Sequence, residues 1–184
     1  MRIYEGSPRQ DFEEVFRSIG AFLDQRSMRE VLLAEAPDGF IVQGLVASEA
    51  NSSAWSESVG HVAKETLTFL DDDIARFMEE AINRRGVDEL PPPGIDAGYY
   101  ESAFRVLGRY MDEQKPRDVF FFEQDGAFVL RLLAGGQGGG RHVLVEFTRE
   151  DIEDMISRAP GLRHRPSTPG ATSATGSRQE ENIG

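Results

Sequence analysis

The side chains best suited to chemistry gather around a glycine-rich stretch late in the chain. Gln137 lies within residues 135–140, which are otherwise all Gly, and Arg141 and His142 follow directly. Glycine permits the close backbone approach that a bound ligand needs. One hypothesis is therefore a small hydrolase or transferase with its site at residues 135–141. The stretch lacks the Lys and the Ser or Thr of a phosphate-binding loop, so nucleotide binding is not predicted.

The first three residues of this stretch, Gly135, Gly136 and Gln137, resemble the Gly-Gly-Gln motif of peptide-chain release factors. That resemblance implies hydrolysis of peptidyl-tRNA, promoted by the loop that carries Gln137. It covers three residues and has no basic surroundings to hold tRNA. The other interpretation is a flexible connection between two strands.

Two histidines each precede a glutamate by four residues, in the pairs His61/Glu65 and His142/Glu146. This spacing would suit a metal on a helix, but both pairs fall in expected strands. Four strand residues at ~3.3 Å each place the side chains about 13 Å apart, whereas the ligands of one metal lie within roughly 2.0–2.3 Å of it. The chain also has no Cys. We therefore predict no metal, no other cofactor and no disulfide.

Trp55 is the only Trp of the chain and lies in a polar segment, residues 47–58. The glycine-rich stretch occupies the matching place in the second half of the chain, between two expected strands. Loops held on a shared scaffold are where binding functions diverge. We predict that a binding site, if there is one, uses Trp55, Gln137, Arg141 and His142. The alternative is that Trp55 folds back over its own sheet as a core residue.

These candidates are positioned by a sequence that repeats itself. Residues 12–35 align with residues 100–123 at a constant offset of 88, and eight of the 24 pairs are identical. The identical pairs are Glu13/Glu101, Phe16/Phe104, Arg17/Arg105, Gly20/Gly108, Asp24/Asp112, Arg29/Arg117, Val31/Val119 and Glu35/Glu123. Self-similarity of this kind predicts a tandem duplication.

Each copy begins with apolar residues at helical spacing, over residues 12–23 and 100–111. A hairpin follows each helix, then a third strand and a second helix, for which Thr148 supplies an N-cap in the second copy. Gly20 and Gly108 lie inside the two first helices, where Gly costs about 1 kcal/mol relative to Ala. We expect another part of the backbone to approach closely at both positions.

The predicted fold class is α+β, with two α-β-β-β-α repeats, antiparallel sheets, helices on one face and a pseudo-twofold axis. The first repeat covers residues 1–86, a Pro-rich linker 87–98, the second repeat 99–159 and a disordered tail 160–184. The two repeats are expected to form one compact domain. Whether they share one sheet or stack two is left open.

Consecutive apolar residues, such as Phe120, Phe121 and Phe122, point to opposite faces of a strand. Both faces of such strands therefore need cover, and helices supply it on one face only. The other face must meet the sheet of the companion repeat or a second molecule.

The chain is acidic, with a net charge of −12, and residues 1–158 carry −13 because the last 26 residues add one positive charge. Nucleic-acid affinity depends on Lys and Arg that neutralise phosphates, so we predict no nucleic-acid partner. No apolar run approaches the ~20 residues that span a bilayer, and the start becomes acidic where a signal peptide would be apolar. We expect a cytoplasmic protein without membrane association.

The α-β-β-β-α order resembles that of double-stranded-RNA-binding domains, in which the last helix begins with basic residues that grip phosphates. Here the first copy begins that helix with Asp71, Asp72 and Asp73. Acidic residues at a helix N-terminus are explained by the helix macrodipole.

In acidity, size and layout the chain is similar to the chaperones of type III secretion, which are acidic dimers that bind extended segments of client protein. The likeness is one of layout without a shared motif, so no family is identified. With no catalytic motif present, we predict a non-catalytic binding or protein-interaction module, chaperone-like or adaptor-like. The expected partner is a protein, a peptide or a second copy of the chain.

Overall fold

The computed structural model describes residues 11–47, 62–85, 89–136 and 139–163. In chain order, the helices and strands are α1 (Phe12–Gln25), β1 (Arg29–Ala36), β2 (Gly39–Ala47), β3 (Val62–Leu70), α2 (Asp71–Arg85), β4 (Glu89–Leu90), α3 (Tyr99–Gln114), β5 (Asp118–Gln124), β6 (Ala127–Gly136), β7 (Gly139–Phe147), α4 (Arg149–Arg158) and β8 (Leu162–Arg163). The predicted α+β class is confirmed. No helix of the described residues is long and apolar enough to cross a membrane.

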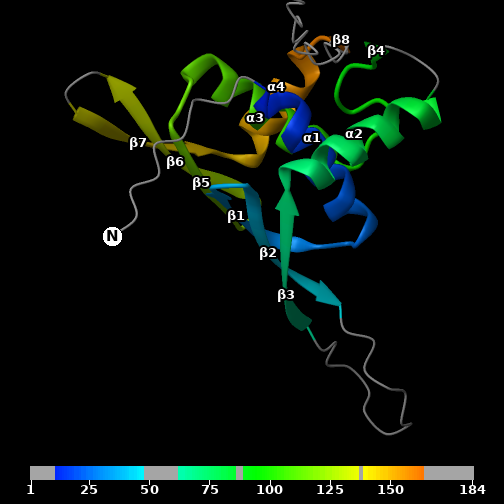
Figure 1. Ribbon diagram of the computed structural model, residues 1–184, viewed down its shortest axis with the longest axis horizontal. Coiled ribbons are helices and arrows are strands. Elements are labelled where there is room, and N and C mark those ends of the chain that lie inside the picture. Colours follow the sequence, from blue (N-terminus) through cyan, green and yellow to red (C-terminus); the bar gives the residue numbers. More distant parts are fainter. Residues whose placement is uncertain (1–10, 48–61, 86–88, 137–138, 164–184) are drawn as a thin grey trace, which may run out of the picture.

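The six long strands form one antiparallel sheet in the order β3-β2-β1-β5-β6-β7 (Figure 1). The halves of the chain meet where β1 pairs with β5, with Leu32 opposite Phe122 and Ala34 opposite Phe120. The two halves of the chain therefore share one sheet and do not stack two. This sheet has β3 and β7 at its edges, and each of them leads directly into a helix.

Local sequence explains the hairpins and one helix start. Asp125 and Gly126 join β5 to β6 with φ of 52° and 80°, the left-handed conformations that a tight two-residue hairpin turn requires. The predicted cap of α4 is confirmed, because the backbone N–H of Asp151 donates to the Thr148 side chain and the Asp151 carboxylate accepts from the Thr148 N–H.

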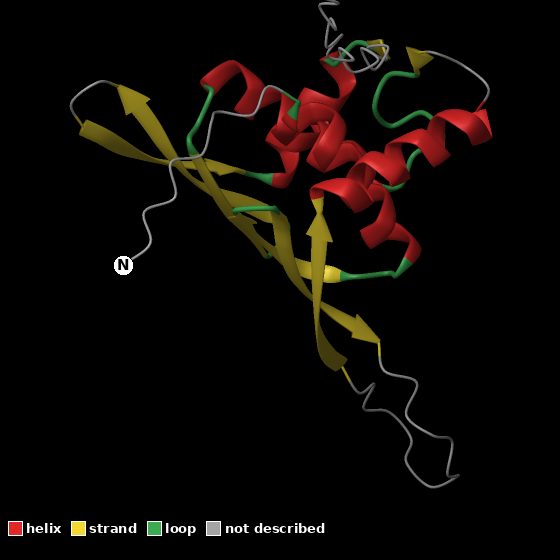
Figure 2. Cartoon of the chain, in the orientation of Figure 1, coloured by secondary structure: helices red, strands yellow, loops and turns green. Residues whose placement is uncertain are grey.

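The core lies between the sheet and the helices, which gather on one side of the sheet (Figure 2). Phe16 of α1 makes edge contacts with Phe40 of β2 and Phe121 of β5. Phe104 of α3 makes the corresponding contacts with Phe121 and with the side chain of Phe128 on β6. One aromatic layer therefore runs across both halves of the chain.

Helices α2 and α3 extend this core toward the two edges of the sheet. On α2, Phe77 contacts Phe22 of α1 and Phe69 of β3. At the other edge, Tyr110 of α3 packs on Phe147, the last residue of β7. All four helices thus belong to one core with the sheet.

The segment between the two halves packs against α3. The N–H of Gly94 donates to the Ser102 Oγ at 2.8 Å, and the Arg105 guanidinium donates to the backbone O of Pro91 and, at 3.4 Å, of Pro160. Here β4 pairs with β8, so residues 89–90 meet residues 162–163. The sequence predicts no strand at these residues, because strands of two residues carry no readable period.

Candidate functional site

The structure describes two of the four predicted binding residues, Arg141 and His142, while Trp55 and Gln137 lie outside the described residues. Arg141 and His142 are exposed neighbours on β7. Because consecutive strand residues point to opposite faces, the side chains of Arg141 and His142 lie on opposite sides of the sheet.

The His142/Glu146 pair lies on a strand, as the sequence predicts, and both side chains are exposed. The part of the chain that the structure describes contains no group of three or more His, Asp or Glu side chains that could hold a metal ion. His61 of the other pair falls outside the described residues.

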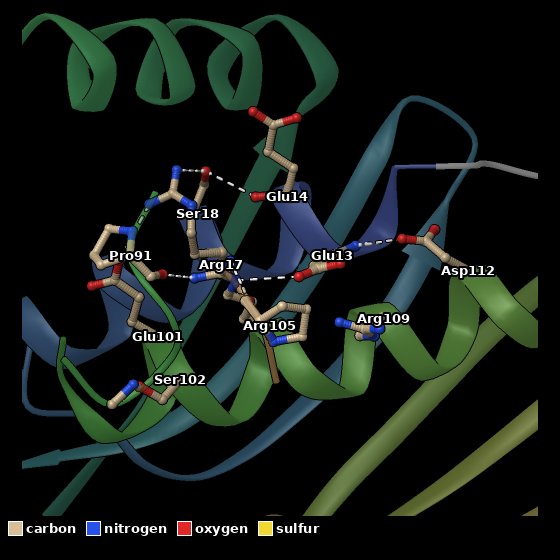
Figure 3. Close-up of polar contacts among 12 residues, drawn as sticks. Glu13, Glu14, Arg17, Ser18, Pro91, Glu101, Ser102, Arg105, Arg109 and Asp112 are labelled. Atoms are coloured by element: carbon tan, nitrogen blue, oxygen red, sulfur yellow. Dashed lines mark hydrogen bonds and ion pairs between the residues drawn. The ribbon is translucent and has the colours of Figure 1, made fainter. Parts of the chain in front are cut away.

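Polar residues do converge between α1 and α3 (Figure 3), where each helix caps the start of the other. The Asp112 carboxylate on α3 accepts the backbone N–H groups of Phe12 and Glu13 at 2.9 and 3.0 Å. The Asp24 carboxylate on α1 accepts those of Tyr100 and Glu101 at 3.0 and 2.8 Å. These bonds satisfy N–H groups that a helix leaves unpaired at its start.

Two ion pairs bridge the same helices. Arg17 donates to Glu101 at 3.2 Å, and Arg105 donates to Glu13 at 3.3 Å. Both arginines are buried, and burial lowers the pKa of Arg105 although Glu13 opposes this shift. Burial also raises the pKa of Glu13, against the lowering effect of Arg105. Each of these four charged side chains is therefore paired with an opposite charge on the other helix.

The helices can exchange these bonds because two glycines let them approach. A Cβ on Gly20 would lie 2.2 Å from the backbone O of Tyr100, and a Cβ on Gly108 would lie 2.3 Å from the backbone O of Phe12. The predicted close approach at both glycines is therefore confirmed, and the partner at each is the backbone of the opposite helix.

The polar cluster offers no room for a substrate. A pocket beside Arg105, lined also by Glu101, Ser102 and the three prolines of residues 91–93, has a volume of about 10 Å³. That is space for about one water molecule. The described contacts of the cluster join the two helices.

The sheet face turned away from the helices carries apolar residues that the described helices do not cover. Strand pairing aligns its residues in two continuous rows, one from Thr68 through Ile41, Ala34, Phe120 and Arg131 to Leu144, the other from Thr66 through Gln43, Leu32, Phe122 and Val129 to Glu146. We call this surface the open face, with Leu32, Ala34, Ile41, Phe120, Phe122, Val129 and Leu144 as its apolar residues.

Two of the apolar residues of the open face are exposed, and the other five are half-buried. Leu144 is 73% exposed and Ile41 37%. Near the centre, the rings of Phe120 and Phe122 lie 6.2 Å apart, and the Arg131 guanidinium stacks 5.2 Å from the centre of the Phe120 ring. Aromatic residues with an adjacent Arg are enriched where protein surfaces bind one another.

The loops predicted as the site lie mostly outside the described residues, whereas strand pairing places His142 in the row of Asp118 and Leu133, on the open face. Consecutive apolar residues in β1 and β5 indicated that a second face needs cover, either from a second sheet of the same chain or from a second molecule. Comparison of this chain with protein-family models finds no match. Comparisons with curated proteins and with solved structures find no match either.

Proposed function

We propose that the protein is a non-catalytic protein-binding module that binds an apolar surface or segment of a partner on the open face. The observation that carries this proposal is the pair of side-chain rows that crosses all six strands without a helix above them. Contiguous exposed apolar patches rimmed by polar residues mark interaction sites.

The architecture behind this face is proposed to be a tandem duplication with a pseudo-twofold axis between β1 and β5. Its support is the reciprocal chemistry of the helices, because Asp24 and Asp112, Arg17 and Arg105, and the two glycines make equivalent contacts at the sequence offset of 88. A duplicated unit that shares one sheet doubles the width of the face available to a partner.

A chaperone-like or adaptor-like role fits the shape of this surface. A broad face suits a protein surface or an extended segment, whereas a small molecule needs a concave pocket that buries most of its area. Burying one Phe side chain contributes about 1.5–3 kcal/mol, so Phe120 and Phe122 dominate the expected binding energy.

Suppression of aggregation tests the proposal. Insulin reduced with dithiothreitol releases an apolar B chain that aggregates, and the reductant cannot alter this protein because it contains no Cys. Wild-type protein should slow the rise of light scattering at near-stoichiometric concentrations. Phe122→Thr combined with Leu144→Thr should weaken the protection by on the order of tenfold, since Thr keeps strand propensity but removes apolar area.

Ile95→Thr is the matched control, because Ile95 is 52% exposed but lies in the segment before α3 and not on the sheet. This variant should protect as well as the wild type. Equal protection by all three proteins, or no protection by the wild type at concentrations where it is monomeric, would contradict the proposed use of the open face.

A further inference from the structure

We infer that a second copy of this chain occupies the open face, so that two sheets pack face to face in an α/β/β/α homodimer. The inference rests on the proposed function, because it names the partner that the open face binds. Its support comes from the area of the face, its charge and the distribution of large and small side chains over it.

The face is large enough for a specific dimer. Six strands about 4.8 Å apart span roughly 24 Å, and about six residues at about 3.3 Å span roughly 20 Å, which gives a face on the order of 500 Å². Two copies would bury on the order of 1,000 Å² together, which reaches the lower bound for specific interfaces.

Charge favours this face over the rest of the surface for a second copy. Residues 1–158 carry −13, and the exposed acidic residues of α2 and α4 would repel the same residues of another chain. The pairing places Arg29, Lys64 and Arg131 on the open face, with Asp118 and Glu146 beside them. The open face is therefore close to neutral, and two copies can approach through it.

Side-chain size selects how the copies align. At the centre of the sheet, β5 presents the large Phe120 and Phe122, while neighbouring β1 presents Ala34 opposite Phe120. A twofold axis that lies between the two sheets, parallel to the strands and midway between β1 and β5, places β5 of each copy over β1 of the other. Phe120 of one copy then fills the space above Ala34 of its partner, twice by symmetry.

The first measurement is the mass in solution. Sedimentation equilibrium at micromolar concentration should give about twice the chain mass of 20.5 kDa. A monomer at concentrations up to about 100 μM, well above the dissociation constants expected of a specific interface of this area, would overturn the inference. Asn83→Glu, an exposed substitution on α2, is the control variant and should leave the dimer intact.

The second measurement tests the alignment with two complementary variants. Ala34→Glu and Phe120→Lys should each raise the dissociation constant by tenfold or more, since each buries an unpaired charge in an apolar contact. Mixed in equal amounts, the two variants should form a heterodimer, because the introduced carboxylate of one chain then faces the introduced ammonium group of the other, while the second contact keeps Ala34 and Phe120. Circular dichroism checks that each variant is folded.

Leu144→Glu tests the same interface if a central variant fails to fold, because Leu144 is 73% exposed and contributes little to the stability of the monomer. It should also raise the dissociation constant about tenfold. Variants that remain dimers would place the interface elsewhere, and a mixture that stays monomeric would refute the β5-over-β1 alignment. A monomeric wild type that still protects insulin would refute the homodimer and leave the proposed function standing.

Discussion

Gly20 and Gly108 set how closely α1 and α3 approach, and each lacks the space for even one methyl group. We expect Gly20→Ala or Gly108→Ala to lower the free energy of unfolding by about 1–3 kcal/mol, because the added Cβ meets rigid backbone. Urea denaturation measures this loss. Asn83→Ala, on the exposed surface of α2, is the control and should change stability by less than about 0.5 kcal/mol. Equal stability of the glycine variants would mean that the helices move apart freely.

The shifted pKa of Asp24 makes the stability of the helix interface depend on pH. Burial raises the pKa of Asp24 above its ordinary value of 3.8, although the backbone N–H groups of Tyr100 and Glu101 lower it. The folded protein then holds this proton more tightly than the unfolded chain, so the contribution to stability is complete below pH 3.8 and is lost as pH rises through the raised pKa. Asp24→Asn removes this titration. The unfolding free energy of the wild type minus that of Asp24→Asn should therefore fall as pH rises from about 3 to 7. Denaturation across that range measures it, and a rising difference would contradict the assignment.

At the scale of elements, the pairing of β4 with β8 ties the segment before α3 to the chain after α4. A protein that ends at Arg163 keeps this pairing and the Pro160 oxygen that accepts from Arg105, whereas one that ends at Ala159 loses both. We expect the shorter protein to melt a few degrees below the longer one, as a loss of about 1 kcal/mol does in a chain of this size. Thermal melts of the two truncated proteins check this. Identical midpoints would show that the pairing adds no stability.

At the scale of the whole molecule, neither half should fold alone as a monomer. A fragment of residues 1–90 loses the β5 partner of β1, the Phe121 ring beside Phe16 and the Asp112 carboxylate that caps α1. It exposes a strand edge and apolar core together, so we expect an aggregate or an obligate dimer. Size-exclusion chromatography and NMR test this. A well-dispersed spectrum from a monomeric fragment would refute the shared core.

Local sequence determined the helices, the hairpins and the two positions of closest approach. Three signals can be recognised without any distant contact, because each depends only on neighbours in the chain. They are the apolar spacing over residues 12–23, the turn at Asp125 and Gly126, and the cap at Thr148. The residues that recur at the offset of 88 also indicated which side chains matter, including Asp24 and Asp112. They did not indicate what those side chains contact.

Tertiary structure alone decided the contacts between the halves. Asp112 and Phe12 are 100 residues apart, and β1 could have met β5 at its edge or faced it across a second sheet, since the sequence shows only that both faces of these strands are apolar. The edge-to-edge arrangement also decided where the candidate binding surface lies. Loops were the expected place for binding because they differ between the copies, but the edge pairing of β1 with β5 left Phe120 and Phe122 on a face without helices. The hydrophobic effect is not directional, so the sequence indicates that this face must be buried but not which surface buries it.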